Sequence, residues 1–119
     1  MPTLNVFHQQ HPEAVIDHPK PERLLQGNPV RRTWNHFNSS RGDVSAGIWA
    51  CEPGAWRIAF AENKEEFFTV IDGRIRITDA EGSAKEIGPG EAAVIPAGFA
   101  GIFEVLEAVK KYYVVVERG

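Results

Sequence analysis

The stretch AFAENKEEFFTVIDGRIRI, Ala59–Ile77, decides the fold. Two runs within it, EEFFTVI and RIRIT, are rich in aromatic and β-branched residues and are typical of β-strands. Asp72-Gly73 lies between them, and this dipeptide predicts a two-residue hairpin because glycine accepts the positive φ of a tight turn. The stretch therefore predicts two antiparallel strands.

The same strand-like pattern continues through the C-terminal part of the chain, residues 41–119. Glycine and proline separate further short runs of strand-forming residues: VSAGIWACE, RIAFAE, KEI, AAVI, IFEVLE and KKYYVVVE. Turn signals recur about every ten residues, which is typical of an all-β sandwich or small barrel. Residues 1–40 contain five of the eight prolines and all four histidines without a sustained period, so we expect an extended N-terminal arm with short strands.

Length and composition limit the class of protein. A chain of 119 residues is long enough for one domain with a single core, and it has no apolar run long enough to span a bilayer. A net charge of −3 with interspersed acids and bases argues against nucleic acid as a partner. The stretch MPTLNVFHQQHPEAV lacks the features of a signal peptide, so we expect a cytoplasmic protein. Cys51 is the only cysteine and is expected to be an inert buried thiol.

The spacing of glycines, a proline and a glutamate resembles the two sequence motifs of the cupin family. The first motif corresponds to Gly54-x5-Phe60-x-Glu62-x3-Glu66-x6-Gly73 and the second to Gly90-x5-Pro96-x-Gly98-x2-Gly101. In the family, histidines occupy the positions of Phe60, Glu62 and Gly101 and hold a metal. Because those three ligand positions are replaced, the resemblance implies the fold, and we expect no metal or other cofactor.

A narrower resemblance rests on GIWACEPGAW, EEFFTVIDGRIRITDAEG, GPGEAAVIPAGFAGIFEV and VKKYYVV. These segments are similar to small single-domain cupins related to the cupin domain of (S)-ureidoglycine aminohydrolase. The resemblance implies a double-stranded β-helix, also called a jelly-roll barrel, that forms a homodimer and often has no assigned activity. The aminohydrolase holds manganese with an acid, two histidines and a glutamine, and this ligand set is absent here.

Strand alternation places several side chains inside the expected barrel. Glu62 shares one face of its strand with Phe60, and Glu66 shares one face of the next strand with Phe68. Two neighbouring carboxylates in an apolar cavity are costly to ionise together, so one is expected to hold a proton or to find a cation. The family resemblance favours Lys111 as that cation, with Tyr113 on the same face. The candidate catalytic residues are Glu62, Glu66, Lys111 and Tyr113, and the candidate ligand-binding residues are Trp49, Phe60, Phe68 and Phe103.

These residues leave three functions open. The first is binding of a small polar metabolite, with metal-independent acid/base chemistry such as isomerisation or removal of ammonia. The second is a non-catalytic ligand-binding or accessory cupin, in which the charged cluster is only a satisfied polar network. The third is a degenerate metalloenzyme: magnesium or calcium could use the two carboxylates, whereas a transition metal would need an imidazole such as His36 from the arm.

The expected outer face of the strand at residues 65–71 is unusually apolar. Phe67, Thr69 and Ile71 alternate with the inward side chains and would leave a largely apolar surface facing water. A second subunit, or the arm of a partner, would cover this surface. We therefore expect a homodimer.

Overall fold

The structure is a computed structural model that describes residues 1–119, and it is almost entirely β. One nine-stranded sheet curls on itself, and two single-turn 3-10 helices interrupt the N-terminal part. The elements are η1 (Phe7–Gln9), β1 (Val15–Asp17), η2 (Pro21–Arg23), β2 (Leu24–Gln26), β3 (Arg31–Asn38), β4 (Val44–Cys51), β5 (Gly54–Ala59), β6 (Lys64–Asp79), β7 (Ala84–Ile87), β8 (Ala92–Ile95) and β9 (Ala100–Glu117). The prediction of an all-β fold is confirmed. None of the helical segments has the length and apolar character needed to cross a bilayer.

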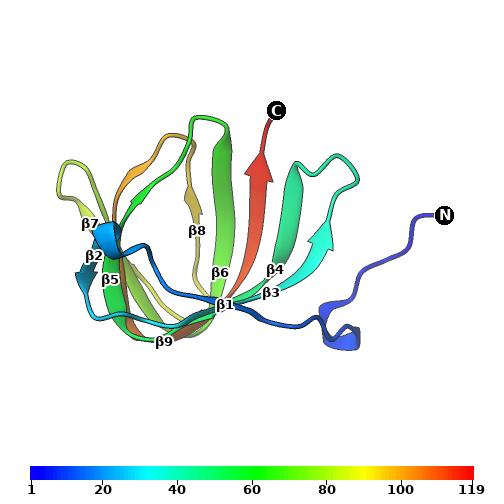
Figure 1. The fold of residues 1–119 in the computed structure, drawn as a ribbon, viewed down its shortest axis with the longest axis horizontal. Helices are drawn as coiled ribbons and strands as arrows, with labels where there is room; N and C mark the ends of the chain where they lie inside the picture. Colours follow the sequence, from blue (N-terminus) through cyan, green and yellow to red (C-terminus); the bar gives the residue numbers. More distant parts are fainter.

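Two long strands, β6 and β9, hold the fold together. They pair antiparallel from Lys64 opposite Glu117 to Asp79 opposite Gly101. The first half of β6 also pairs with β8 and its second half with β7, whereas β9 pairs first with β5 and then with β4. Each long strand therefore belongs to both of two facing layers, one containing β1, β3, β4 and β8 and the other β2, β5 and β7. Figure 1 shows this curl, with the bend of β9 at the bottom of the view.

The bend in β6 lies at Gly73. The register between β6 and β9 shifts at several steps between Val70 and Ile75, and Gly73 has a φ of 84°. A Cβ atom at this position would lie 2.1 Å from the carbonyl oxygen of Ala108, so only glycine fits. The predicted hairpin at Asp72-Gly73 is therefore wrong: the residues form a bulge that bends one continuous strand. A positive φ serves a tight turn and a glycine bulge equally well, which is why the sequence suggested the turn.

The N-terminal segment is tied to the sheet by short strands. β1 pairs with β3, and β2 pairs with β5. β3 pairs with β4 from Arg31 to Asn38, with a bulge between Asn35 and Phe37. The eight-residue strand β3 thus lies within residues 1–40, the segment expected to be an arm with short strands.

The core lies between the two layers near the bends of β6 and β9. Phe68 and Ile75 have no exposed surface, and Val105 and Val109 are also buried. Three aromatic rings form one side of the core. Trp56 stacks on Phe103 with a 5.1 Å centroid distance, and the Trp49 ring meets Phe103 edge-on at 5.7 Å. The same three rings line a cavity between the layers.

Candidate functional site

A cavity of about 450 Å³ lies between the two layers above the aromatic core. Its apolar wall comes mainly from the β5 layer and contains Trp56, Ile58, Phe60 and Phe103. Its polar wall comes from β3 and the second half of β9 and contains Arg31, Thr33, Asn35, Lys111 and Tyr113. A cavity with one aromatic wall and a few convergent polar groups has the general character of a small-molecule site.

An ion pair lies at the base of this cavity. Lys111 Nζ donates to Glu66 Oε2 at 2.7 Å, and the two side chains are only 5% and 12% exposed. The ammonium also lies over the rings of Trp49, Phe68 and Phe103, at 4.6, 4.4 and 5.2 Å from their centroids. Taking both charges out of water is costly, and the carboxylate together with the three ring faces offsets part of that cost.

Strand register brings the two charged groups together. Lys111 lies opposite Val70 of β6, and the four-carbon lysine side chain extends toward Glu66, which shares the inner face of β6. The neighbouring residue Lys110 is exposed because alternate side chains of β9 face outward. The expected inward orientation of Lys111 and Tyr113 is confirmed, and of the two carboxylates considered, Glu66 is the one that forms the ion pair.

Tyr113 adds a buried hydroxyl one step along the same face of β9. Its phenol oxygen donates to Asn35 Oδ1 at 2.7 Å, which leaves the two amide hydrogens of Asn35 for another acceptor. Burial, and then the nearby charge of Glu66, raise the pKa of Tyr113 to about 12. Tyr113 is therefore a neutral hydrogen-bond donor throughout the physiological pH range.

The structure corrects the expected position of Glu62. β5 ends at Ala59, so strand alternation stops before residue 62, and Glu62 lies exposed in the turn that leads to β6. Its carboxylate occupies the space beside Gly98 and does not line the cavity. The expected pair of inward carboxylates is therefore reduced to Glu66 alone.

Three of the four aromatic residues expected to bind ligand line the cavity: Trp49, Phe60 and Phe103. Lys64 lies over the Phe60 ring at 4.8 Å, near the opening. Phe68 is fully buried beneath the Lys111 ammonium and does not line the cavity. Phe68 is therefore placed to support the lysine, whereas the sequence suggested a direct contact with ligand.

The residues at the metal-ligand positions do not fit a metal. Phe60 offers no donor atom, Glu62 is exposed outside the cavity, and a Cβ atom at Gly101 would lie 2.0 Å from the Thr78 carbonyl oxygen. Glu66 already accepts from Lys111. No three His, Cys, Asp or Glu residues in the chain are grouped so that they could hold a metal ion.

His36 does not complete such a site. It lies on β3 but lines a separate groove with Phe7, Gln10 and Trp34. Its ring stacks on Phe7 with a 4.3 Å centroid distance, and its Nδ1 atom lies 3.0 Å from Gln10 Oε1. Desolvation, and then the nearby His11, lower the pKa of His36. His36 is therefore not placed to join Glu66 in a metal site, because side chains alternate along β3 and His36 does not share the cavity face of Asn35.

Sequence reasoning missed the contribution of β3 to the site. Arg31, Thr33 and Asn35 are spaced two residues apart and line the cavity together. Arg31 is held by a bidentate contact with Asp17, at 2.9 and 2.8 Å, and lies 5.5 Å above the Trp56 ring. The period of two in Arg31-Thr33-Asn35 was a usable signal, but the surrounding prolines made this segment resemble an arm.

Comparison with known proteins defines the family. The family model of the EutQ-like cupin domain matches residues 38–113. The chain belongs to the EutQ-like cupin family. No curated protein matches the sequence. The match confirms the expected cupin jelly-roll fold, whereas a specific relation to ureidoglycine aminohydrolase stays a prediction.

Solved structures similar to this cupin support the same fold. A protein of unknown function from Pseudomonas syringae pv. tomato has a TM-score of 0.77 at 21% identity, over 87% of this chain and 44% of that chain. The EutQ protein of Clostridium difficile has a TM-score of 0.64 at 23% identity, over 75% and 64% of the two chains. Ectoine synthase from P. lautus has a TM-score of 0.64 at 15% identity, over 73% and 64%. This cupin therefore spans less than two thirds of the length of each of these proteins.

Proposed function

We propose that this cupin binds a small polar metabolite in the cavity between its two layers and uses Glu66 and Lys111 for metal-independent acid/base chemistry. The observation that carries the proposal is the Lys111–Glu66 ion pair, which lies almost fully buried at the base of the cavity and lines it. Well-packed apolar side chains would stabilise a fold at least as well as such a pair. A costly charged pair in a cleft is therefore a candidate functional site.

The free atoms of the pair are suited to proton transfer. Glu66 Oε2 accepts from Lys111, so Glu66 Oε1 remains available to accept a proton from a ligand. The Lys111 ammonium has two further hydrogens that can stabilise negative charge developing on a ligand oxygen. The neutral Tyr113 phenol holds Asn35 with its amide hydrogens free for an acceptor group. Proton abstraction followed by return of the proton to another ligand atom would be an isomerisation.

Binding is tested with a thermal-shift screen against ureides, amino-acid derivatives and sugars, because a ligand of the folded state raises the melting temperature. The screen compares wild type with the double variant Lys111→Met/Glu66→Gln, which removes both charges of the pair together. Lys85→Gln is the control, since Lys85 is exposed on β7 outside the cavity. A ligand of the cavity raises the melting temperature of wild type and the control only. Equal shifts in all three proteins, or none in wild type, contradict the proposal.

Catalysis is tested with Glu66→Gln and any compound that the screen identifies. The amide keeps the size of the side chain but cannot act as a base, so turnover is expected to disappear while binding is partly kept. A protein that binds the compound and never converts it would instead be a non-catalytic ligand-binding cupin. This alternative shares the pocket and differs only in the absence of turnover.

We also propose that the protein is a homodimer. Three large apolar side chains are unusually exposed: Phe67 by 46%, Val94 by 59% and Tyr112 by 44%. They come from β6, β8 and β9, and β6 pairs with both of the other strands. Phe67 lies opposite Val94 in the pairing of β6 with β8, so their side chains form one apolar surface on the outside of the barrel. A second copy of the chain would remove this surface from water.

A further inference from the structure

Five basic side chains gather in a groove beside the opening of the cavity. The groove has a volume of about 320 Å³ and lies between the segment around η2 and strand β5. Its cations are Lys20, Arg23, Arg31, Arg57 and Lys64, and no acidic residue lines it. The chain as a whole has a net charge of −3, so this concentration of positive charge opposes the overall sign.

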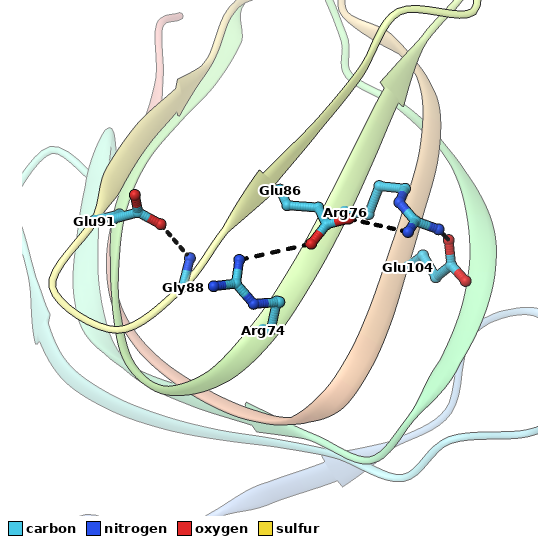
Figure 2. A network of polar contacts seen from close by, with 6 residues as sticks. All are labelled: Arg74, Arg76, Glu86, Gly88, Glu91 and Glu104. Atoms are coloured by element: carbon cyan, nitrogen blue, oxygen red, sulfur yellow. Dashed lines mark hydrogen bonds and ion pairs between the residues drawn. The ribbon is translucent and has the colours of Figure 1, made fainter.

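Most of these cations have no carboxylate partner. Arg31 is the one that forms an ion pair, with Asp17. Arg74 and Arg76 are neutralised by contrast: Figure 2 shows both paired with Glu86, at 3.6 and 3.0 Å, while Arg76 also reaches Glu104 at 3.2 Å. The groove is therefore a local excess of positive charge that would attract an anion.

The fold gives the groove a defined shape. The Arg23 guanidinium lies 3.5 Å from the carbonyl oxygen of Arg57 in β5, which connects the η2 segment to the groove wall. Arg31 lies over Trp56 and Lys64 over Phe60, so two of the cations rest on aromatic rings. An aromatic ring beneath a cation keeps the charge at a fixed place without neutralising it.

The groove and the cavity adjoin each other. They share five lining residues: Arg31, Trp56, Ile58, Phe60 and Lys64. A ligand in the cavity that extends past Phe60 would enter the groove, with Arg31 and Lys64 at the boundary between them.

We propose that the groove binds the phosphate group of a metabolite whose remaining part occupies the cavity. The inference rests on the proposed function, since it assigns a chemical class to the ligand of the same site. Arginine presents several N–H donors in a planar fork that matches phosphate oxygens, and lysine adds compact charge. A groove of about 320 Å³ has room for a phosphate or diphosphate and is much smaller than the track that a nucleic acid strand would need.

The test measures the binding of inorganic pyrophosphate by isothermal titration calorimetry, because this probe reports on the groove without requiring the cavity ligand. The variant is Lys20→Gln/Arg57→Gln, since both side chains are exposed and make no ion pair, and its melting temperature is checked against wild type. Lys85→Gln, which removes one exposed cation elsewhere, is the control. We expect the double variant to bind pyrophosphate about tenfold more weakly, the control to bind within about twofold of wild type, and wild-type binding to weaken as salt is added.

Several outcomes overturn the inference. The inference is overturned if wild type does not bind pyrophosphate or if the double variant binds it as tightly as wild type does. It is also overturned if the control loses as much affinity for pyrophosphate as the double variant. Tighter binding of a short RNA or of anionic lipid vesicles than of pyrophosphate, lost in the double variant, would assign the groove to another partner and also overturn it. The Lys111→Met/Glu66→Gln variant separates this inference from the proposed function: it is expected to keep pyrophosphate binding while losing the binding of a cavity ligand.

Discussion

Lys111 and Glu66 are 45 positions apart in the sequence, and their side chains meet at 2.7 Å between two bent strands. The pair lies within the layer that contains β4 and β8, on the halves of β6 and β9 that pair with each other and with those two strands. The contact thus depends on the register of β6 against β9, two strands that are distant in sequence. The Lys111 ammonium lies over the buried Phe68 ring of the core, and Lys111 also lines the cavity.

The first prediction concerns the stability contribution of this pair. Lys111→Met leaves a buried carboxylate without a cation and is expected to lower the free energy of unfolding by about 3 kcal/mol. Adding Glu66→Gln removes the unpaired charge and is expected to restore most of that loss. Urea denaturation of wild type, both single variants and the double variant provides the measurement. A double variant as unstable as Lys111→Met would mean that lost packing, and not unpaired charge, causes the effect.

The second prediction concerns alkaline pH. The fold raises the pKa of Tyr113 to about 12 from its ordinary value near 10, so the folded state favours the neutral phenol. This contribution to stability is fully present below about pH 10 and is lost as the pH rises toward about 12. Wild type should therefore lose more stability than Tyr113→Phe between pH 9 and 11.5, a comparison that cancels the titration of groups shared by both proteins. Parallel loss in the two proteins would contradict the assignment.

The sequence predicted those parts of the site that depend on strand alternation alone. The long strands β6 and β9 contain Glu66, Lys111 and Tyr113. Alternate side chains of a strand face the same side, so these orientations follow once the direction of one side chain in each strand is known. The choice between Lys110 and Lys111 came from the family resemblance, because both lysines are followed by a tyrosine at a spacing of two.

Other parts could not be obtained from local patterns. Glu62 continues the alternation of β5 in the sequence, but the chain turns after Ala59 because Phe60 N bonds to the Phe99 carbonyl oxygen, a contact distant in sequence. Asn35 enters the site only because β3 pairs with β4, which brings it to Tyr113 on β9. The basic groove combines residues from η2, β3, β5 and β6, and no single segment of the sequence is strongly basic.

The third prediction concerns the bend of β6. Gly73 and Gly82 both have positive φ values, 84° and 88°, but a Cβ atom meets nothing at Gly82 and lies 2.1 Å from the Ala108 carbonyl oxygen at Gly73. Gly82→Ala should cost about 1 kcal/mol of unfolding free energy through backbone strain alone. Gly73→Ala adds a steric clash with β9 and should cost roughly 2 to 4 kcal/mol. Denaturant unfolding of the matched pair measures both values, and equal losses would show that the close approach of β6 and β9 is not required.

The last prediction concerns the apolar outer face of the barrel. If a second copy covers Phe67 and Val94, then Phe67→Lys places a charge in the interface and should shift the protein from dimer to monomer in sedimentation experiments at micromolar concentration. Leu25→Lys is the matched control, because Leu25 is also an exposed apolar residue, 42% exposed, but lies on β2 at the edge of the other layer. The control should remain a dimer with an unchanged melting temperature. A monomeric wild type, or a dimer that survives Phe67→Lys, would show that this face is not the contact between subunits, and the exposed Phe67 would then need a different partner.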